Sequence, residues 1–180
     1  MKSEMTIDEK GNKHWKLPNG NYHREDGPAI ELSNGGTQWY LNGSRHRENG
    51  PAIEDSDGKS WWVNGKMHRE DGPAIEWSNG DKEWGINNKL HRENGPAVER
   101  SNGDKKWYLN GFRHRENGPA IENSDGKSWW VKGKKHREDG PAIEWSNGDK
   151  EWFISGIQKS EVVYKKKMRS RKLNQLLHQK

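Results

Sequence analysis

The residues best suited to chemistry in this chain are a histidine, an arginine and a glutamate that stand side by side. They open the motif His-Arg-Glu-[Asp/Asn]-Gly-Pro-Ala-[Ile/Val]-Glu, which occurs six times. Histidine and glutamate can work as general acid and base, and arginine can hold an anion. The motif could therefore be a repeated reaction site or a repeated structural unit. Its copies begin at His23, His46, His68, His91, His114 and His136.

The repetition itself favours the structural interpretation. An enzyme needs one concave site at which different groups converge, and six near-equal copies do not supply that asymmetry. Identical side chains on neighbouring hairpins can instead form ladders that stabilise a sheet. We therefore predict that the protein is not an enzyme and has no catalytic residues.

A shared metal site is excluded by spacing. If each repeat contributes two strands, equivalent histidines lie about 10 Å apart, because neighbouring strands are ~4.8 Å apart. Zinc–nitrogen bonds are only ~2.0–2.1 Å long, so successive histidines cannot bind one ion. The sequence also lacks glycine-rich phosphate-binding motifs. We predict no metal and no cofactor.

Some features of the composition are typical of a disordered chain and others of a folded one. Hydrophobic residues make up 27% of the 180 residues and the mean hydropathy is −1.42, values typical of disorder. However, 11 Trp residues, at regular positions, indicate a folded chain. There is no Cys, and no apolar run resembles a signal or a membrane span. We expect no membrane association and a cytoplasmic location, which for a viral protein is the host cytoplasm.

The net charge of +5 is concentrated in the C-terminal tail. Residues 160–180 carry a net charge of +6, whereas residues 1–159 carry −1. Contacts with phosphates or anionic lipids are therefore expected at the tail. Its basic residues include Lys165, Lys166, Lys167, Arg169, Arg171 and Lys172.

The motif recurs at intervals of 22 or 23 residues, a period typical of repeat architectures in which neighbouring units supply the core. A longer period of 68 residues is also present, and the stretch at 68–84 returns unchanged at 136–152. We predict an atypical N-terminal capping repeat at 1–22, two three-repeat blocks at 23–90 and 91–158, and a basic tail at 159–180.

Each repeat has the pattern of a β-hairpin. Asn-Gly, Ser-Asp-Gly and Ser-Asn-Gly-Asp turns separate short, alternating, β-prone stretches. The [Asp/Asn]-Gly-Pro step is either a further turn or a kink in the longer strand, because proline has no N–H to donate to a sheet.

The alternation of side chains predicts two faces for the sheet. The first Trp of each unit shares a core face with the apolar residue two positions later, as Trp39 does with Leu41. We expect the isoleucine or valine of each motif to join this core face, with Trp77 and Trp145 in the core as well. The opposite face then carries the glutamate of each Gly-Pro-Ala-[Ile/Val]-Glu and the residue after each first Trp. The aromatic residues at this last position are Tyr40, Trp62, Tyr108, Trp130 and Phe153.

The recurring turn-and-hairpin unit, with W-x-[LVI]-x-G and H-x-x-x-G, resembles MORN repeats over about residues 5–158. It is most similar to the variant with HRxxGPA heads found in bacteria, phages and large DNA viruses. The resemblance implies an all-β fold, an elongated single-layer antiparallel sheet with two strands per repeat, and a kinked strand at the [Asp/Asn]-Gly-Pro step. It also implies scaffolding or interaction, with no shared reaction.

Tyr40, Trp62, Tyr108, Trp130 and Phe153 are the predicted partner-binding residues, because exposed Trp and Tyr are common anchors in interfaces. The same aromatics could merely order a thin sheet, and the sequence leaves both explanations open. The tail predicts a short C-terminal helix with Leu173, Leu176 and Leu177 on one side. This helix either covers the last hairpin or contacts phosphates and anionic lipids.

We therefore expect a non-enzymatic repeat scaffold that binds a protein partner. The genomes in which such repeats occur suggest a phage or viral protein that blocks a host defence factor. The alternative is a nucleic-acid-binding protein that uses the tail for phosphates and the aromatics for bases. An uncovered apolar face also favours a homodimer.

Overall fold

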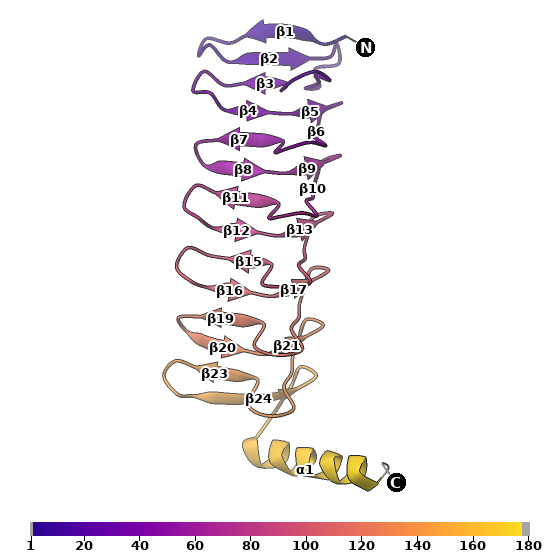
Figure 1. Cartoon of the computed structure of the whole chain (residues 1–180), viewed down its shortest axis with the longest axis vertical. Coiled ribbons are helices and arrows are strands. Elements are labelled where there is room, and N and C mark those ends of the chain that lie inside the picture. The colour runs from indigo at the N-terminus through magenta and orange to yellow at the C-terminus, as the bar shows by residue number, and fades with distance from the viewer. Residues whose placement is uncertain (1, 178–180) are drawn as a thin grey trace. The chain divides into compact units, whose positions relative to one another are not determined.

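The computed structural model describes residues 2–177, which divide into two compact units. Among the described residues the first unit comprises 2–91 and 97–101, and the second comprises 92–96 and 102–177. Each unit consists of short antiparallel strands in consecutive hairpins, and the second ends in a helix (Figure 1). The expected all-β fold of tandem hairpins with one C-terminal helix is confirmed for the described residues.

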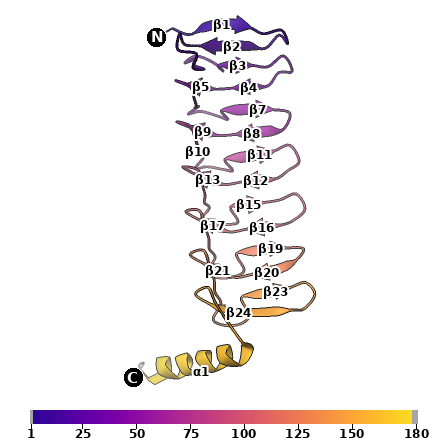
Figure 2. The ribbon, with the colours of Figure 1, turned by 180° about the vertical axis from the view of Figure 1, so that it is seen from behind.

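In the first unit the sheet strands are hydrogen-bonded in the order β1-β2-β3-β4-β7-β8-β11-β12-β15. These strands are β1 (Glu4–Ile7), β2 (Lys13–Lys16), β3 (Ile30–Glu31), β4 (Thr37–Gln38), β7 (Ile53–Asp55), β8 (Gly58–Ser60), β11 (Ile75–Trp77), β12 (Lys82–Glu83) and β15 (Val98–Glu99). Two-stranded ribbons continue from one end of them (Figure 2). The ribbons are β5 (Tyr40–Leu41) with β6 (Ser44–Arg45), β9 (Trp62–Val63) with β10 (Lys66–Met67), and β13 (Gly85–Ile86) with β14 (Lys89–Leu90).

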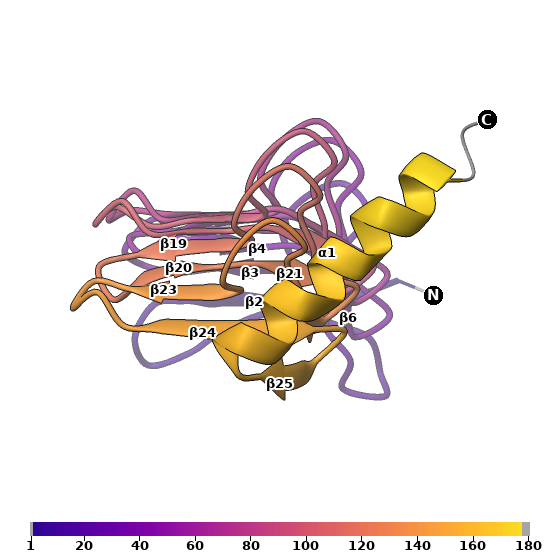
Figure 3. The ribbon, with the colours of Figure 1, turned by 90° about the horizontal axis from the view of Figure 1, so that it is seen from below.

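The second unit repeats this arrangement with the order β16-β19-β20-β23-β24-β25. Its sheet strands are β16 (Lys105–Lys106), β19 (Ile121–Asn123), β20 (Gly126–Ser128), β23 (Ile143–Trp145), β24 (Lys150–Ile154) and β25 (Ile157–Lys159). Its ribbons are β17 (Tyr108–Leu109) with β18 (Phe112–Arg113) and β21 (Trp130–Val131) with β22 (Lys134–Lys135). Helix α1 (Glu161–Leu177) contacts β24, which it crosses in Figure 3.

The [Asp/Asn]-Gly-Pro step is a loop that interrupts one long strand. The N–H of His68 donates to the carbonyl of Trp61, and the N–H of Trp61 donates to the carbonyl of Ala74. His68 and Ala74, six residues apart, therefore both bond the backbone of Trp61. The residues between them, Arg69–Pro73, form a loop outside the ladder. Because proline cannot donate to a ladder, it stands in this loop at no cost to the sheet.

The ribbon turns explain the Asn-Gly pairs of the sequence. Asn42 has a φ of 50° and Gly43 a φ of 80°, the positive values that a tight two-residue hairpin turn requires at both central positions. Asn64 and Gly65 repeat the conformation in the next ribbon. The turn residues therefore fix where each ribbon reverses.

The predicted assignment of side chains to the two faces is wrong for the isoleucines. Ile75 pairs directly with Ser60, and the Nε1 of Trp62 donates to the Oγ of Ser60 at 2.8 Å. Ile75 therefore lies on the face of Trp62, and Glu76 lies on the face of Trp61. Alternation along one strand sets parity within that strand, but the register between strands decides which residues of the two strands meet. The sequence pattern does not specify that register.

Both faces bury apolar side chains in each unit. The face of the first Trp residues, which we call the head face, buries the alanine of every motif completely. The face of Tyr40, Trp62, Tyr108, Trp130 and Phe153, which we call the aromatic face, buries Ile30 and Val98 in the first unit and Ile143 in the second. Each sheet thus has a thin apolar layer on both sides, which accounts for the high Trp content of a chain that is otherwise polar.

Candidate functional site

Four of the motif histidines hold the ribbon turn of their own repeat. The Nδ1 of His23 accepts a hydrogen bond from the N–H of Asn42 at 3.1 Å, and His46 accepts one from Asn64 in the same way. In the second unit His114 and His136 accept from Lys132 and Ser155. An Nδ1 that accepts a backbone N–H cannot at the same time take a proton from a substrate.

The arginines of the motif cover the Trp residues of the head face. The Cζ of Arg69 lies 3.9 Å from the ring centroid of Trp61, a cation–π stack. Its Nη1 donates to the carbonyl of Pro73 and to Glu76, and its backbone N–H donates to the carbonyl of Gly85. Arg24, Arg47, Arg115 and Arg137 stack in the same way, each on the first Trp of the preceding unit.

The acidic residues of the motif complete this arrangement. Glu70 is exposed, with its Oε1 3.5 Å from the Nε2 of His68. A hydrogen bond from Arg69 lowers the pKa of Asp71, and one from Arg137 lowers the pKa of Asp139. The polar groups of the motif are therefore bonded to one another and to the backbone, as expected of structural residues.

The predicted partner-binding residues form two groups, one on the aromatic face of each unit. Tyr40 and Trp62 belong to the first unit, and Tyr108, Trp130 and Phe153 belong to the second. Tyr40, Trp62, Tyr108 and Trp130 are half-buried. The expectation that Phe153 is exposed is wrong, since it packs with Ala142 and Ile143 and is 9% exposed.

Basic side chains separate the aromatic rings of this face. In the second unit the Nε of Arg113 donates to the Tyr108 hydroxyl, and its Cζ lies 4.9 Å from the centroid of Trp130. The Nζ of Lys135 lies 5.8 Å from Trp130 and 4.7 Å from Phe153. In the first unit Arg45 stands likewise between Tyr40 and Trp62.

These cations were missed by the sequence analysis. Arg45 and Arg113 occupy the position directly before a motif histidine, and so does Lys135. Arg45, Arg113 and Lys135 also stand five residues after an aromatic residue of the aromatic face, which is the distance across a short ribbon turn. That spacing could have identified them.

The prediction that Trp77 and Trp145 belong to the core is wrong. They are 44% and 42% exposed and so belong to the exposed large apolar side chains of the described residues. Each ends a hairpin strand and pairs with a glycine, Gly58 or Gly126. Gly126 has a φ of 139°, and a Cβ there would approach the Glu144 carbonyl oxygen to 2.1 Å. Only glycine fits, so the Trp beside it has no side chain opposite to cover it.

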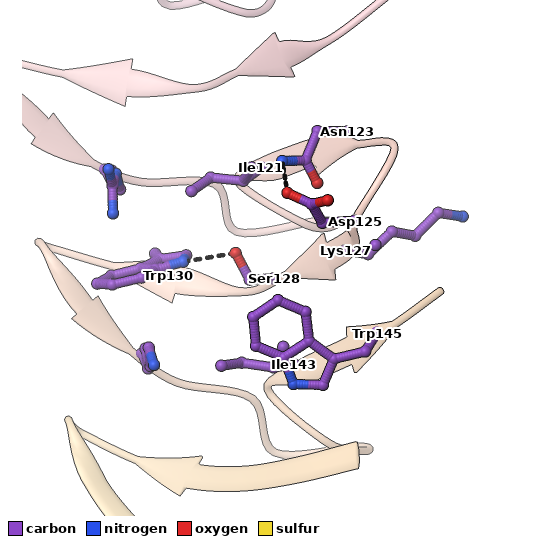
Figure 4. Close-up of a pocket in the computed structure, with 11 residues that line it drawn as sticks. Ile121, Asn123, Asp125, Lys127, Ser128, Trp130, Ile143 and Trp145 are labelled. Atoms are coloured by element: carbon purple, nitrogen blue, oxygen red, sulfur yellow. Dashed lines mark hydrogen bonds between the residues drawn. The ribbon is translucent and has the colours of Figure 1, made fainter. Parts of the chain in front are cut away.

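The second unit has a cavity of about 420 Å³ on its aromatic face. Trp130 and Trp145 stand on either side of it, with Ile121, Ser128 and Ile143 between them (Figure 4). The remaining lining residues are Arg113, Asn123, Asp125, Gly126, Lys127 and Lys135, of which Lys127 points away from the two rings in Figure 4. An apolar cavity with a few polar groups at its edge is the usual form of a binding site.

The C-terminal helix is joined to the last repeat of the second unit. Tyr164 is buried, and its hydroxyl donates to the carbonyl of Arg137 and accepts from the N–H of Gly140. Burial raises the pKa of this phenol. Arg171 forms an ion pair with Glu138.

The other basic residues of the tail differ among themselves. Lys165 pairs with Glu161 within the helix, whereas Lys166, Lys167 and Arg169 are exposed. The side chains of Lys172, Leu173, Leu176 and Leu177 lie outside the described part of the structure.

Comparison with known proteins gives no further assignment, since no family model and no curated protein matches this chain. Within residues 2–177 no helix has both the length and the apolar composition needed to cross a membrane. The same residues contain no group of three or more histidine and acidic side chains arranged to hold a metal ion.

Proposed function

We propose that the protein is a non-enzymatic repeat scaffold whose aromatic face binds a protein partner. The observation that carries this proposal is the pair of exposed tryptophans, Trp77 and Trp145, each at the same position of its three-repeat block. Trp is among the residues most often responsible for binding energy in interfaces. Large exposed apolar side chains that gather on one surface favour an interaction site.

The bonds of the motif residues support the same proposal, because they leave other residues for recognition. Its histidine and arginine are engaged in hydrogen bonds within their own repeat, as at His23 and Arg69. They therefore serve as the frame, and the residues that vary between repeats remain for recognition. Trp62 and Trp130 stay in the proposed binding surface, and Trp77 and Trp145 join it.

Affinity capture from a host lysate, with and without nuclease, tests this function. We expect a protein that is retained after nuclease treatment by the wild type and lost when Trp77→Ala and Trp145→Ala are combined. Phe112→Ala is the matched control, because Phe112 is 62% exposed but does not line the cavity. Circular dichroism should show that all variants are folded. Equal capture by the double variant would contradict the proposal.

A second candidate, nucleic-acid binding, is favoured by Lys166, Lys167 and Arg169, which are exposed and form no ion pair within residues 2–177. Reversing these three charges leaves Tyr164 and Arg171 in place. If this function holds, the charge-reversed variant loses binding to single-stranded DNA, and wild-type binding falls steeply with salt. Equal binding by both proteins rules the tail out.

A further inference from the structure

The cavity of the second unit has a distinct chemistry at each side. At the Trp130 side stand Arg113 and Lys135, which contact aromatic rings and a hydroxyl but form no ion pair with any carboxylate within residues 2–177. At the Trp145 side Asp125 accepts a hydrogen bond from the Asn123 amide at 3.4 Å. Two cations without counter-ions, beside an apolar cavity, make one side of the site complementary to negative charge.

The apolar part of the cavity suits an inserted side chain. Its floor contains Ile121, Ser128 and Ile143, and Trp145 is substantially exposed at its edge. The hydroxyl of Ser128 is already bonded to the Nε1 of Trp130 at 2.8 Å, and the Nε1 of Trp145 is bonded to Glu151. Both indoles therefore have their polar atoms satisfied and offer their apolar surfaces to a ligand.

The corresponding residues of the first unit keep the frame and change the charge. Trp62, Trp77 and Ser60 match Trp130, Trp145 and Ser128, whereas Met67 replaces Lys135 and Asp55 replaces Asn123. Met67 is buried, and it stands where a Cβ on Gly85 would meet its Cε at 2.2 Å. At the residues that match the cavity of the second unit, the first unit thus has one cation fewer and one carboxylate more.

We propose that the cavity of the second unit binds an acidic peptide segment of a partner protein. The carboxylates of the segment lie against Arg113 and Lys135, and one of its apolar side chains enters between Trp130 and Trp145. This inference rests on the proposed function and names the chemistry of the partner at that surface. The second unit then binds this segment in preference to the first because it has Lys135 where the first has Met67, and Asn123 where the first has Asp55.

Fluorescence anisotropy on the full-length chain tests the inference. The probes are a short labelled peptide with a central Phe flanked by Asp and Glu, and its match with Lys at every acidic position. We expect saturable binding of the acidic peptide alone, weakened about tenfold by Lys135→Met with Asn123→Asp, since ion pairs at interfaces give selectivity. The reverse exchange, Met67→Lys with Asp55→Asn, should create a second binding event in the first unit. These exchanges place at each site the residue that the other block carries at the matching position. Thermal melting verifies folding, because Gly85 beside Met67 stands where the second block has Phe153 beside Lys135.

Three results would overturn the inference: equal binding of the acidic and basic peptides, binding unchanged by Trp145→Ala, or displacement of the peptide by single-stranded DNA at equal concentration. The proposed function is tested separately, because loss of lysate capture in the Trp77→Ala and Trp145→Ala variant would still support it. Loss of capture without binding of the acidic peptide would therefore refute the inference alone.

Discussion

Residues 23–90 hold 8 Lys and Arg against 12 Asp and Glu, whereas residues 91–158 hold 12 against 11. The two blocks have the same spacing of motifs, first Trp residues at matching positions, and one exposed tryptophan each, Trp77 and Trp145. The differences fall on positions such as Met67 and Lys135, which line the aromatic face, and not on the histidine and arginine of the motif. The comparison shows which residues are constrained by the frame and which are left to vary on the surface.

The largest effect is expected at a feature that the two blocks share. Gly58 and Gly126 have φ values of 141° and 139°, and in both cases an added Cβ would lie 2.1 Å from a backbone oxygen. Either change to Ala should reduce the free energy of unfolding by about 3 kcal/mol or more, through strain and displacement of the neighbouring strand. Thermal or urea unfolding measures this loss.

The control for the glycine variants is Gly103→Ala. Gly103 also has a positive φ of 93°, but nothing lies within 4 Å of the added Cβ. It should cost only the conformational strain, about 1 kcal/mol. If Gly126→Ala costs no more than Gly103→Ala, the close approach between the strands is not the reason for glycine.

A smaller effect should separate two matching arginines. Arg115 bonds both the carbonyl of Pro119 and Glu122, whereas Arg47 bonds the carbonyl of Pro51 while Glu54 pairs with Lys59. Both changes to Ala uncover a Trp, but only Arg115→Ala removes the ion-pair partner of the following glutamate. We expect it to cost about 1 kcal/mol more than Arg47→Ala, as measured by urea unfolding. Equal costs would mean that solvent replaces the lost contact with Glu122.

The C-terminal helix offers a test confined to the second unit. Tyr164→Phe keeps the buried ring but removes the hydroxyl that bonds Arg137 and Gly140. The loss should be about 1–2 kcal/mol, since a buried carbonyl and N–H lose their partner. Hydrogen exchange should become faster at residues 136–142 and stay unchanged in residues 1–91. A uniform change in both units would contradict a local role for the helix.

The smallest effect is expected from Asp139→Asn. A hydrogen bond from Arg137 lowers the pKa of Asp139 in the folded state, so this pair stabilises the fold above the unfolded-state pKa of the carboxyl. The benefit is lost as the pH falls through the lowered folded-state value. Because the Asp139 side chain is 83% exposed, solvent screening keeps the loss at pH 7 below about 1 kcal/mol. The difference in unfolding free energy between the two proteins, measured by urea unfolding over a series of pH values, should be largest at pH 7 and shrink as the pH is lowered.

The sequence could predict the repeat period, the turns and the hairpins, because each depends on neighbouring residues such as Asn42 and Gly43. It could not predict that Ile75 faces Trp62, because that depends on the register between strands. The exposure of Trp77 was missed for a related reason, since it follows from the glycine on the paired strand. The motif was expected to stabilise the sheet through ladders of identical side chains. The bond that the structure shows, from the Asn42 N–H to His23, could be seen only in three dimensions.

The stack of a motif arginine on a Trp has a consequence for the length of such chains. It joins each repeat to the one before it, as Arg69 to Trp61 and Arg24 to Trp15, and Tyr164 of the C-terminal helix bonds the Gly140 N–H of the last motif. Whole repeats can therefore be gained or lost by recombination without leaving an unmatched junction, provided that the first hairpin and the C-terminal helix are kept. An added block would multiply the surface that the repeats present, and substitutions such as Lys135 at the position of Met67 would then give the copies different charges.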